Sequence, residues 1–330
     1  MATCKDVAQR AGVSTATVTR AFESGSTIKE STRQRILQIA HEMQYTPNLT
    51  ARSLKQQRTH TIGITLKDAD NPFYMQVAKR LEHRLLERNY RALLSFADPV
   101  TLDETKCLEV MFGSRVDGVI FSPETTACAS VVDAMQAQNI RFLQIFKHSF
   151  ANLDALCIEN ELGVFMAAQY LLDLGHRRML FISDGHDARI AGFWRALETQ
   201  QVPPFCAQEV PLEKDAAEAT AHLRAEMDRI HPTAMICIAN RASTVAFRLL
   251  WDMGLRIPED MSLIINDDLQ WCQMLDITTV AHPYDEIAQC AVDKLLDRLE
   301  NPSQPQEPKT TWIKPLLIRR KSVSRISPGE

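Results

Sequence analysis

The residues best suited to chemistry near the start of this sequence are short hydroxyl and basic side chains between Ser14 and Arg20. On one face of a helix, side chains of this size can approach base edges in the major groove of DNA, where hydroxyl and guanidinium groups make hydrogen bonds. The face that we predict to do so carries Thr15, Ala16, Thr17, Thr19 and Arg20.

Two short helices joined by a tight turn are predicted to hold this face. Val7, Ala8 and Ala11 recur at helical spacing. Gly12 then ends the first helix as a residue free to take a positive φ, and Ser14 opens the second helix as its N-cap. Together these signals predict a helix-turn-helix within about twenty residues.

A third helix is predicted to complete a small core, with Ser31 or Thr32 as its cap. The alternative is an ordinary small helical bundle with a polar outer face. The residues predicted to form the core are Val18, Ala21 and Phe22 on the second helix and Ile36, Leu37, Ala40 and Met43 on the third.

Charge separates this segment from the rest of the chain. Residues 1–60 hold nine Lys and Arg against four acids, a net charge of +5, whereas the whole chain is at −4 and the remainder therefore carries −9. A basic head on an acidic body is what a protein needs if only its head is to contact phosphates.

The run from Cys4 to Arg20, with Tyr45-Thr46-Pro47-Asn48 and Ala51-Arg52-Ser53-Leu54, resembles the head and hinge of the LacI/GalR family of bacterial transcription repressors. The resemblance implies a recognition helix in the major groove and a hinge helix that folds only on DNA. The predicted DNA-binding residues are Thr3, Ser14, Thr15, Ala16, Thr17, Thr19, Arg20, Asn48, Ala51, Leu54 and Lys55.

The predicted hinge covers residues 47–59, after a head of residues 1–46. Pro47 suits the first turn of a new helix but cannot continue an earlier one. By the resemblance, Leu54 is a wedge that unstacks a base step from the minor groove, flanked by Asn48, Ala51 and Lys55. Leu54 could instead pack against the body of the protein.

Length and composition indicate a globular chain of several domains. The 330 residues are 45% hydrophobic and 24% charged, which leaves room for the head and about two further domains. We expect a cytoplasmic protein, because neither a membrane-spanning run nor a signal peptide is evident. The eight cysteines lack metal-binding spacing, so we expect reduced thiols and no metal or cofactor.

From Thr61 onward, short apolar runs alternate with amphipathic segments, which predicts α/β lobes with parallel sheets and a ligand site where the strands end. The predicted strands are 61–66, 91–96, 118–121, 142–146, 178–182, 234–238 and 261–265. The predicted helices are 73–88, 102–114, 131–138, 163–174, 190–199, 216–228 and 244–253.

The family resemblance extends more weakly over this body and implies a two-lobed periplasmic-binding-protein type I fold. It implies an effector-binding and dimerisation domain over residues 60–330. Its N-lobe would comprise about 60–157 and 284–313, and its C-lobe about 158–283 and 314–330. Segments that carry the resemblance are Asn71-Pro72-Phe73-Tyr74, Arg115-Val116-Asp117-Gly118, Leu174-Gly175-His176-Arg177 and Thr278-Thr279-Val280.

The resemblance also implies an effector cleft between the lobes. Phe73 and Tyr74 would stack on a ring, Arg189 would hold polar or anionic groups, and Asn240 and Asp267 would hydrogen-bond hydroxyls. Simpler roles stay open: Phe73 as a core residue, Asp267 as a turn cap, and Arg189 as the surface partner of Asp184 or Asp187.

Two basic residues depart from the family pattern. Arg241 stands on the first turn of a predicted helix, where a cation is disfavoured by roughly 0.3–1 kcal/mol, and Lys147 follows a strand at the expected cleft mouth. With Arg189 they predict an acidic effector such as a sugar acid or sugar phosphate. Alternatively, Arg241 points to solvent with Asn240 as N-cap, or pairs with Asp267 or Asp268.

The sequence therefore favours a dimeric transcription regulator, with a homodimer on a pseudo-palindromic DNA operator. No heptads follow Lys321, which argues against an added tetramer-forming helix. One alternative is a DNA-binding regulator whose cleft is non-functional and which answers to a protein partner. An enzyme on the two-lobed fold is disfavoured, because phosphate-binding and nucleophile motifs are absent from the sequence.

Overall fold

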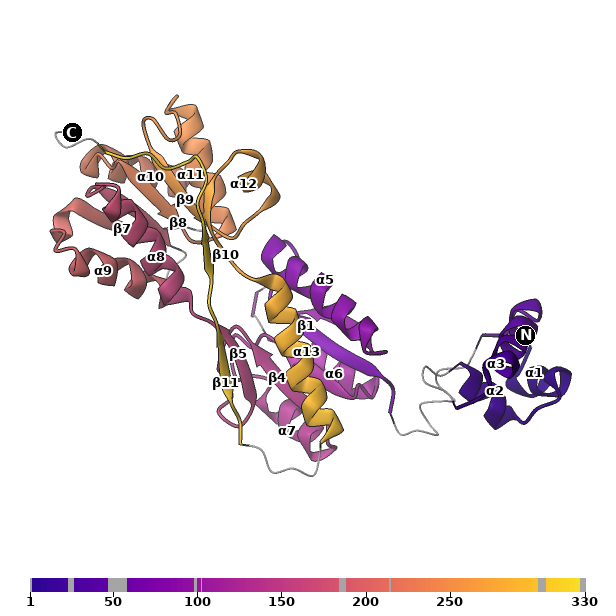
Figure 1. The fold of residues 1–330 in the computed structure, drawn as a ribbon. Coiled ribbons are helices and arrows are strands. Elements are labelled where there is room, and N and C mark those ends of the chain that lie inside the picture. Colours follow the sequence, from indigo (N-terminus) through magenta and orange to yellow (C-terminus); the bar gives the residue numbers. More distant parts are fainter. Residues whose placement is uncertain are drawn as a thin grey trace. The chain divides into compact units, whose positions relative to one another are not determined.

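The computed structural model describes residues 2–22, 27–46, 58–97, 100–101, 103–183, 188–213, 215–301 and 307–326. The chain divides into two compact units, residues 1–60 and residues 61–330 (Figure 1). We describe each unit by itself and call them the head and the body.

The head contains three helices, α1 (Cys4–Ala11), α2 (Thr15–Ala21) and α3 (Glu30–Glu42). Gly12 ends α1 with a φ of 63°, and the Ser14 hydroxyl accepts a hydrogen bond from the Thr17 backbone N–H at the start of α2. Both predicted signals of the helix-turn-helix are therefore confirmed. A small core lies between the helices and consists of Val7, Ala8, Ala11, Val18, Ala21, Ile36 and Ala40.

Two details of the predicted third helix are wrong. The helix begins at Glu30 with Lys29 as its N-cap and without a side-chain cap, so Ser31 and Thr32 lie inside the first turn. Ile39, rather than Leu37, packs against the core. The cause is the earlier start of the helix, which places the predicted caps within it.

The first lobe of the body is built on a six-stranded parallel sheet in the order β11-β5-β4-β3-β1-β2. Its strands are β1 (Thr61–Leu66), β2 (Arg91–Phe96), β3 (Gly118–Phe121), β4 (Arg141–Ile145), β5 (Asp154–Ile158) and β11 (Thr310–Ile313). Its helices are α5 (Pro72–Glu87), α6 (Thr105–Gly113), α7 (Ala129–Ala137) and α13 (Tyr284–Glu300).

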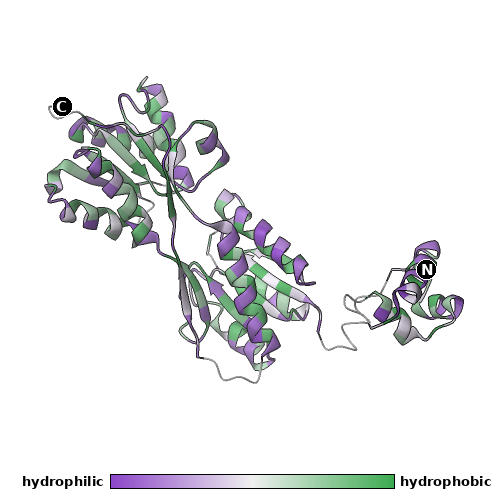
Figure 2. Ribbon diagram, viewed as in Figure 1, coloured by the Kyte–Doolittle hydropathy of each residue, from purple (hydrophilic) through white to green (hydrophobic). Residues whose placement is uncertain are grey.

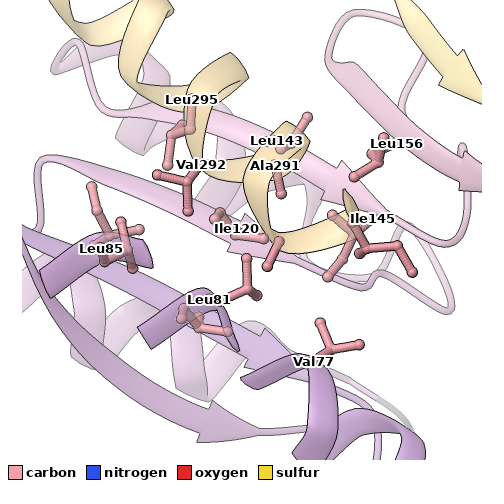
Figure 3. Packing of buried hydrophobic residues seen from close by; sticks show 14 of the residues in the cluster. Val77, Leu81, Leu85, Ile120, Leu143, Ile145, Leu156, Ala291, Val292 and Leu295 are labelled. Atoms are coloured by element: carbon pink, nitrogen blue, oxygen red, sulfur yellow. The ribbon is translucent and has the colours of Figure 1, made fainter. Parts of the chain in front are cut away.

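Helices cover both faces of this sheet, as its apolar strands require. Val77 and Leu81 of α5 and Val292 and Leu295 of α13 pack on one face against Ile120 (Figure 3). Helices α6 and α7 contribute Leu108, Met111, Val132 and Met135 to the core on the other face. The β strands are mostly hydrophobic and the outer helices carry the polar residues (Figure 2).

The second lobe repeats this architecture with the strand order β12-β10-β9-β8-β6-β7, in which only β12 is antiparallel to its neighbour. Its strands are β6 (Met179–Ser183), β7 (Ala207–Pro211), β8 (Ala234–Cys237), β9 (Ser262–Asn266), β10 (Thr278–Ala281) and β12 (Leu316–Ile318). Its helices are α8 (Asn160–Asp173), α9 (Ala188–Thr199), η1 (Pro204–Cys206), α10 (Ala216–Ile230), α11 (Asn240–Asp252) and α12 (Gln270–Met274).

The chain passes between the two sheets after β5, after β10 and after β11 (Figure 1). Each strand and helix predicted for the body has a counterpart in the structure, so the predicted α/β architecture is confirmed. Elements that periodicity did not reveal are β5, β7, β10, β11, β12, α12 and α13. Of these, β5, β10, β11, β12 and α13 border the crossings.

The C-terminal segment is fixed to the second lobe by a buried histidine. The His176 ring nitrogens lie 2.8 Å from Thr233 Oγ1 and 3.0 Å from the Ser324 carbonyl oxygen. Burial lowers the pKa of His176, so the folded protein favours the neutral ring.

We predict that His176→Phe lowers the free energy of unfolding by about 1–3 kcal/mol, because it removes the hydrogen bonds of a buried ring to two partly buried groups. Since the folded-state pKa is lowered, the stability that His176 contributes is present above its unfolded pKa and is lost as pH falls through the folded pKa. Urea titrations at pH 8 and pH 5.5 measure both effects. The exposed-site control His83→Gln should match the wild type; a His176→Phe protein as stable as that control would contradict the assignment.

Candidate functional site

The outer face of α2 in the head presents a mixture of free and internally bonded side chains. Thr15, Ala16 and Arg20 are exposed, and Arg20 makes no hydrogen bond or ion pair with the described residues. The hydroxyls of Thr17 and Thr19 are half-buried and bond within the helix, to Ser14 Oγ at 2.9 Å and to the Thr15 carbonyl at 3.0 Å. Thr15, Ala16 and Arg20 are thus the side chains most available to a ligand.

Two further predicted DNA-contacting residues act as helix caps. Thr3 forms a reciprocal capping box with Asp6 at the start of α1, and Ser14 caps α2. These hydrogen bonds also depress the pKa of Asp6, chiefly through the Thr3 backbone. Each cap accepts one first-turn N–H, from Asp6 and from Thr17, and the other N–H groups of a helix N-terminus are the kind of donor that binds phosphate. Asn48, Ala51, Leu54 and Lys55 lie outside the described residues.

A cleft of about 700 Å³ lies between the two lobes of the body. It occupies the carboxyl ends of strands from both sheets, where parallel α/β folds bind ligands. Its lining is Lys67, Asp68, Asn71, Phe73, Tyr74, Glu124, Phe146, Lys147, Ile158, Asn160, Ala188, Arg189, Ile238, Ala239, Asn240, Asn266, Asp267 and His282.

Phe73 is the centre of an aromatic cluster on the first-lobe side of the cleft. It is only 9% exposed. Its ring centroid lies 4.9–5.9 Å from those of Tyr74, Phe146, His282 and Tyr284. Phe73 therefore combines the two roles considered from the sequence, since it belongs to the hydrophobic core and also lines the cleft. Burial raises the pKa of Tyr74, so its hydroxyl stays protonated.

Asp267 lies just after β9 on the second-lobe side and is buried, with a φ of 73° that is unusual for a residue other than glycine. Its Oδ1 lies 3.2 Å from His282 Nε2 and 3.3 Å from Asn266 Nδ2. The carboxylate is thus a fixed hydrogen-bond acceptor in the cleft.

Arg189 and Asn240 complete the predicted second-lobe residues of the cleft. The Arg189 Nη1 donates to the Ile238 carbonyl at 2.7 Å, which orients the guanidinium. Its expected alternative partners, Asp184 and Asp187, lie outside the described residues. Asn240 is the first residue of α11, and the N-cap is Ala239, so the expectation that Asn240 caps the helix is wrong.

Of the three cations predicted to attract an acidic effector, Lys147 and Arg189 line the cleft and Arg241 does not. Arg241 is exposed on α11 and does not line the cleft, because Ala242 and Ser243 occupy the buried face of that turn. Lys147 Nζ lies 2.6 Å from Glu124 Oε2, so this cation already has a carboxylate partner.

The cleft as a whole is balanced in charge. Its charged lining consists of Lys67, Lys147 and Arg189 against Asp68, Glu124 and Asp267. Asp268, a predicted partner of Arg241, instead binds Arg320 at 2.7 Å. Burial disfavours the Asp268 carboxylate, but hydrogen bonds from Arg320 and Thr279 outweigh it and lower its pKa.

Several cleft residues were not identified from the sequence: Lys67, Asp68, Asn71, Glu124, Phe146, Asn160, Asn266 and His282. Lys67 and Asp68 directly follow β1, and Phe146 directly follows β4. Position at the carboxyl end of a predicted strand was the available signal for them. His282 follows β10, which the sequence did not reveal.

The described part of the chain offers neither a metal-ligand cluster nor a membrane-spanning helix. It contains no group of three or more His, Cys, Asp or Glu side chains arranged to hold a metal ion. None of its helices has both the length and the apolar character needed to span a bilayer. Its eight cysteines are free thiols.

Comparison with known proteins gives matches over both units. Residues 3–48 match the family model for bacterial regulatory proteins of the lacI family, and residues 168–323 match a periplasmic binding protein-like domain. The HTH-type transcriptional regulator DegA of Bacillus subtilis is 32% identical over 299 residues, which cover 86% of this chain and 88% of DegA.

Two further similarities extend the comparison. The ribose operon repressor of Haemophilus influenzae is 25% identical and covers 98% of this chain and 99% of its own length. The crystal structure of a LacI family regulator from Enterococcus faecium with bound ribose is 26% identical, with a TM-score of 0.70 over 81% of this chain and 100% of that one.

Proposed function

Because the chain belongs to the LacI family of DNA-binding transcription regulators, we propose that it binds a pseudo-palindromic operator as a homodimer under the control of a small polar effector. Its relatives are regulators and repressors, and the protein is accordingly a transcription regulator and not an enzyme. The observation that carries the proposal is a basic helix-turn-helix joined in one chain to a two-lobed body with a polar cleft.

The head supports operator binding through its charge and its exposed recognition face. We assign residues 1–46 to DNA binding, 47–59 to a hinge that folds on DNA, and 60–330 to effector binding and dimerisation. Thr15, Ala16 and Arg20 would read base edges, and the capped N-termini at Thr3 and Ser14 would contact phosphates. In the hinge, Leu54 would be the minor-groove wedge, with Asn48, Ala51 and Lys55 beside it.

The cleft supports a neutral, sugar-sized effector better than the acidic one expected from the sequence. Its cations and acids balance, and Lys147 already has a carboxylate partner. Asp68 and Asp267 offer acceptors for hydroxyl hydrogens, Arg189 and Asn240 offer donors, and the Phe73 cluster offers an apolar wall. The related structure with bound ribose is consistent with this class.

A homodimer is supported by exposed apolar side chains on both lobes. On the second lobe, Trp251 is 73% exposed and Met274 is 78% exposed, beside a hollow of about 730 Å³ that Trp251 lines. On the first lobe, Leu86 of α5 and Leu94 of the edge strand β2 are also exposed. Patches of this kind mark association surfaces, and a two-fold dimer would cover them on both copies.

Effector binding would act by selecting one arrangement of the two lobes. A ligand in the cleft contacts both lobes, so it stabilises the arrangement in which both sets of contacts are made. In a dimer, that choice changes the positions from which the two hinges start and thereby the affinity for the operator.

For the head, we predict that Arg20→Ala lowers affinity for the operator identified by genomic footprinting by roughly 10- to 100-fold, through the loss of a base or phosphate contact worth about 1–3 kcal/mol. The control Arg10→Ala removes the same charge from α1, where Arg10 pairs with Glu42 at 3.2 Å. Fluorescence anisotropy on operator and random DNA measures both. Equal losses for the two variants would argue against a recognition role for Arg20.

For the cleft, we predict that Asp267→Asn weakens effector binding by about 10- to 100-fold, because a hydrogen bond to a charged acceptor contributes roughly 1.5–3 kcal/mol. Calorimetry against neutral sugars, sugar acids and sugar phosphates identifies the class. Arg241→Ala is the matched control and should bind normally, since Arg241 is outside the cleft. A response only to acids would restore the acidic effector; no response at all with intact operator binding would favour a protein partner.

For the dimer, we predict that Trp251→Glu shifts the protein toward monomer by at least tenfold in dissociation constant, since a charge in an apolar interface is unfavourable. Sedimentation velocity over a concentration series measures the shift. Phe205→Glu is the control, because Phe205 is 79% exposed on η1 beside the edge strand β7. If both variants stay dimeric, Trp251 lies outside the interface.

A further inference from the structure

Glu104 is a carboxylic acid buried inside the first lobe. It is the N-cap residue of α6 but makes no side-chain cap, and it is only 1% exposed. Neither carboxylate oxygen has a hydrogen-bond partner of normal geometry among the described residues. A buried ionised carboxylate without such a partner is energetically unfavourable, so this site favours a proton on the acid.

The groups around Glu104 place it against the loop of residues 122–128, which joins β3 to α7. Burial raises the pKa of Glu104 to about 7, the backbone N–H groups of Glu104 and Glu124 oppose the rise, and the carboxylates of Glu124 and Asp103 add to it. Burial likewise raises the pKa of Cys128, at the far end of the loop, to about 11, with Glu104 contributing.

The same loop carries Glu124 into the cleft. Its side chain is 9% exposed and lies 2.6 Å from Lys147 Nζ and 3.6 Å from Lys67 Nζ. The Glu124 carboxylate thus contacts two cleft lysines. Glu104 lies close enough to Glu124 to be affected by both the backbone N–H and the carboxylate of Glu124. Ser122 Oγ, in this loop, is also buried without a partner among the described residues, so the loop is not held by a complete set of hydrogen bonds.

We propose that Glu104 is a positioning residue whose protonation state controls the loop of residues 122–128 and, through it, the position of Glu124 in the cleft. When Glu104 is ionised, its repulsion of Glu124 favours the Glu124 contacts with Lys67 and Lys147. When it is protonated, that repulsion disappears and the loop relaxes. The proton is exchanged with solvent, and no other group changes its charge.

Loss of water from the cleft decides whether effector binding favours the protonated or the ionised form of Glu104. This inference rests on the proposed function of the cleft as the effector site. A ligand that fills the cleft removes water from around Glu124 and makes a second carboxylate behind it less favourable. Glu104 therefore takes up a proton on binding, and affinity is higher at pH 6 than at pH 8. Each unit by which binding raises the Glu104 pKa corresponds to up to a tenfold change in affinity.

Hydrogen exchange in the full-length protein tests the proposal without any ligand. After correction for intrinsic exchange rates, amides of residues 122–128 in the wild type should change protection severalfold between pH 6 and pH 8. Glu104→Gln should remove this dependence, whereas Glu109→Gln, an exposed acid on the same helix, should retain it. Glu124→Gln should shift the midpoint to lower pH, since it removes a neighbouring charge.

The outcomes separate this proposal from the proposed function. A wild-type loop with constant protection, or a Glu104→Gln loop that still varies with pH, would overturn the role of Glu104. Calorimetry with D-ribose in buffers of different ionisation enthalpy then measures proton uptake, which Glu104→Gln should abolish. Failure of D-ribose to bind would count only against D-ribose as the effector, because the exchange experiment has by then decided the role of Glu104.

Discussion

The contact of His282 with Asp267 is the interaction on which the geometry of the cleft depends. His282 lies where the chain leaves β10 for α13, and its ring reaches Asp267 of the second lobe at 3.2 Å and the Phe73 ring of the first lobe at 5.2 Å. Both members of the polar pair are almost fully buried. A buried carboxylate needs hydrogen-bond donors, and His282 supplies one of them at a crossing between the lobes.

This constraint decides what the cleft can recognise. With Oδ1 held by His282 and Asn266, Asp267 presents its remaining oxygen as an acceptor, which suits a ligand hydroxyl and repels an anion. On the facing lobe, Lys67 and Lys147 both contact the Glu124 carboxylate, so the charge of Lys147 is already paired and the cleft lining as a whole has no excess of cations. The net charge of a cleft depends on all of its ionised side chains, because ion pairs within the lining reduce the charge that is available to a ligand.

The sequence was most informative where a signal is local. Gly12 and Ser14 predict the turn of the head through backbone conformation and capping, and the apolar runs around Ile64 and Ile236 predict buried strands. Helix α13 was not predicted, although its buried residues recur at helical spacing, and its place in the first lobe follows a crossing that periodicity does not encode.

The cleft was harder to predict than the fold, for a reason visible in two basic residues. Lys147 and Glu124 are 23 positions apart, and their contact exists only because β3 and β4 are parallel neighbours. Arg241 is one position from the cleft residue Asn240, yet the helical rotation turns it outward. Closeness in sequence to Asn240 therefore suggested a cleft role for Arg241 that the structure does not give it. The long sequence separation from Glu124 hid the ion pair of Lys147.

The crossings also explain how occupancy of the cleft can be transmitted. Two cleft residues, Asn160 and His282, lie directly beside crossings, after β5 and after β10 respectively. A ligand that hydrogen-bonds there touches the segments about which the lobes must rotate, in addition to the lobes themselves. The lobes are packed cores that resist deformation, so the conformational change is concentrated at these joints. Ligand contacts beside the crossings can thus change the arrangement of the lobes without deforming the core of either lobe.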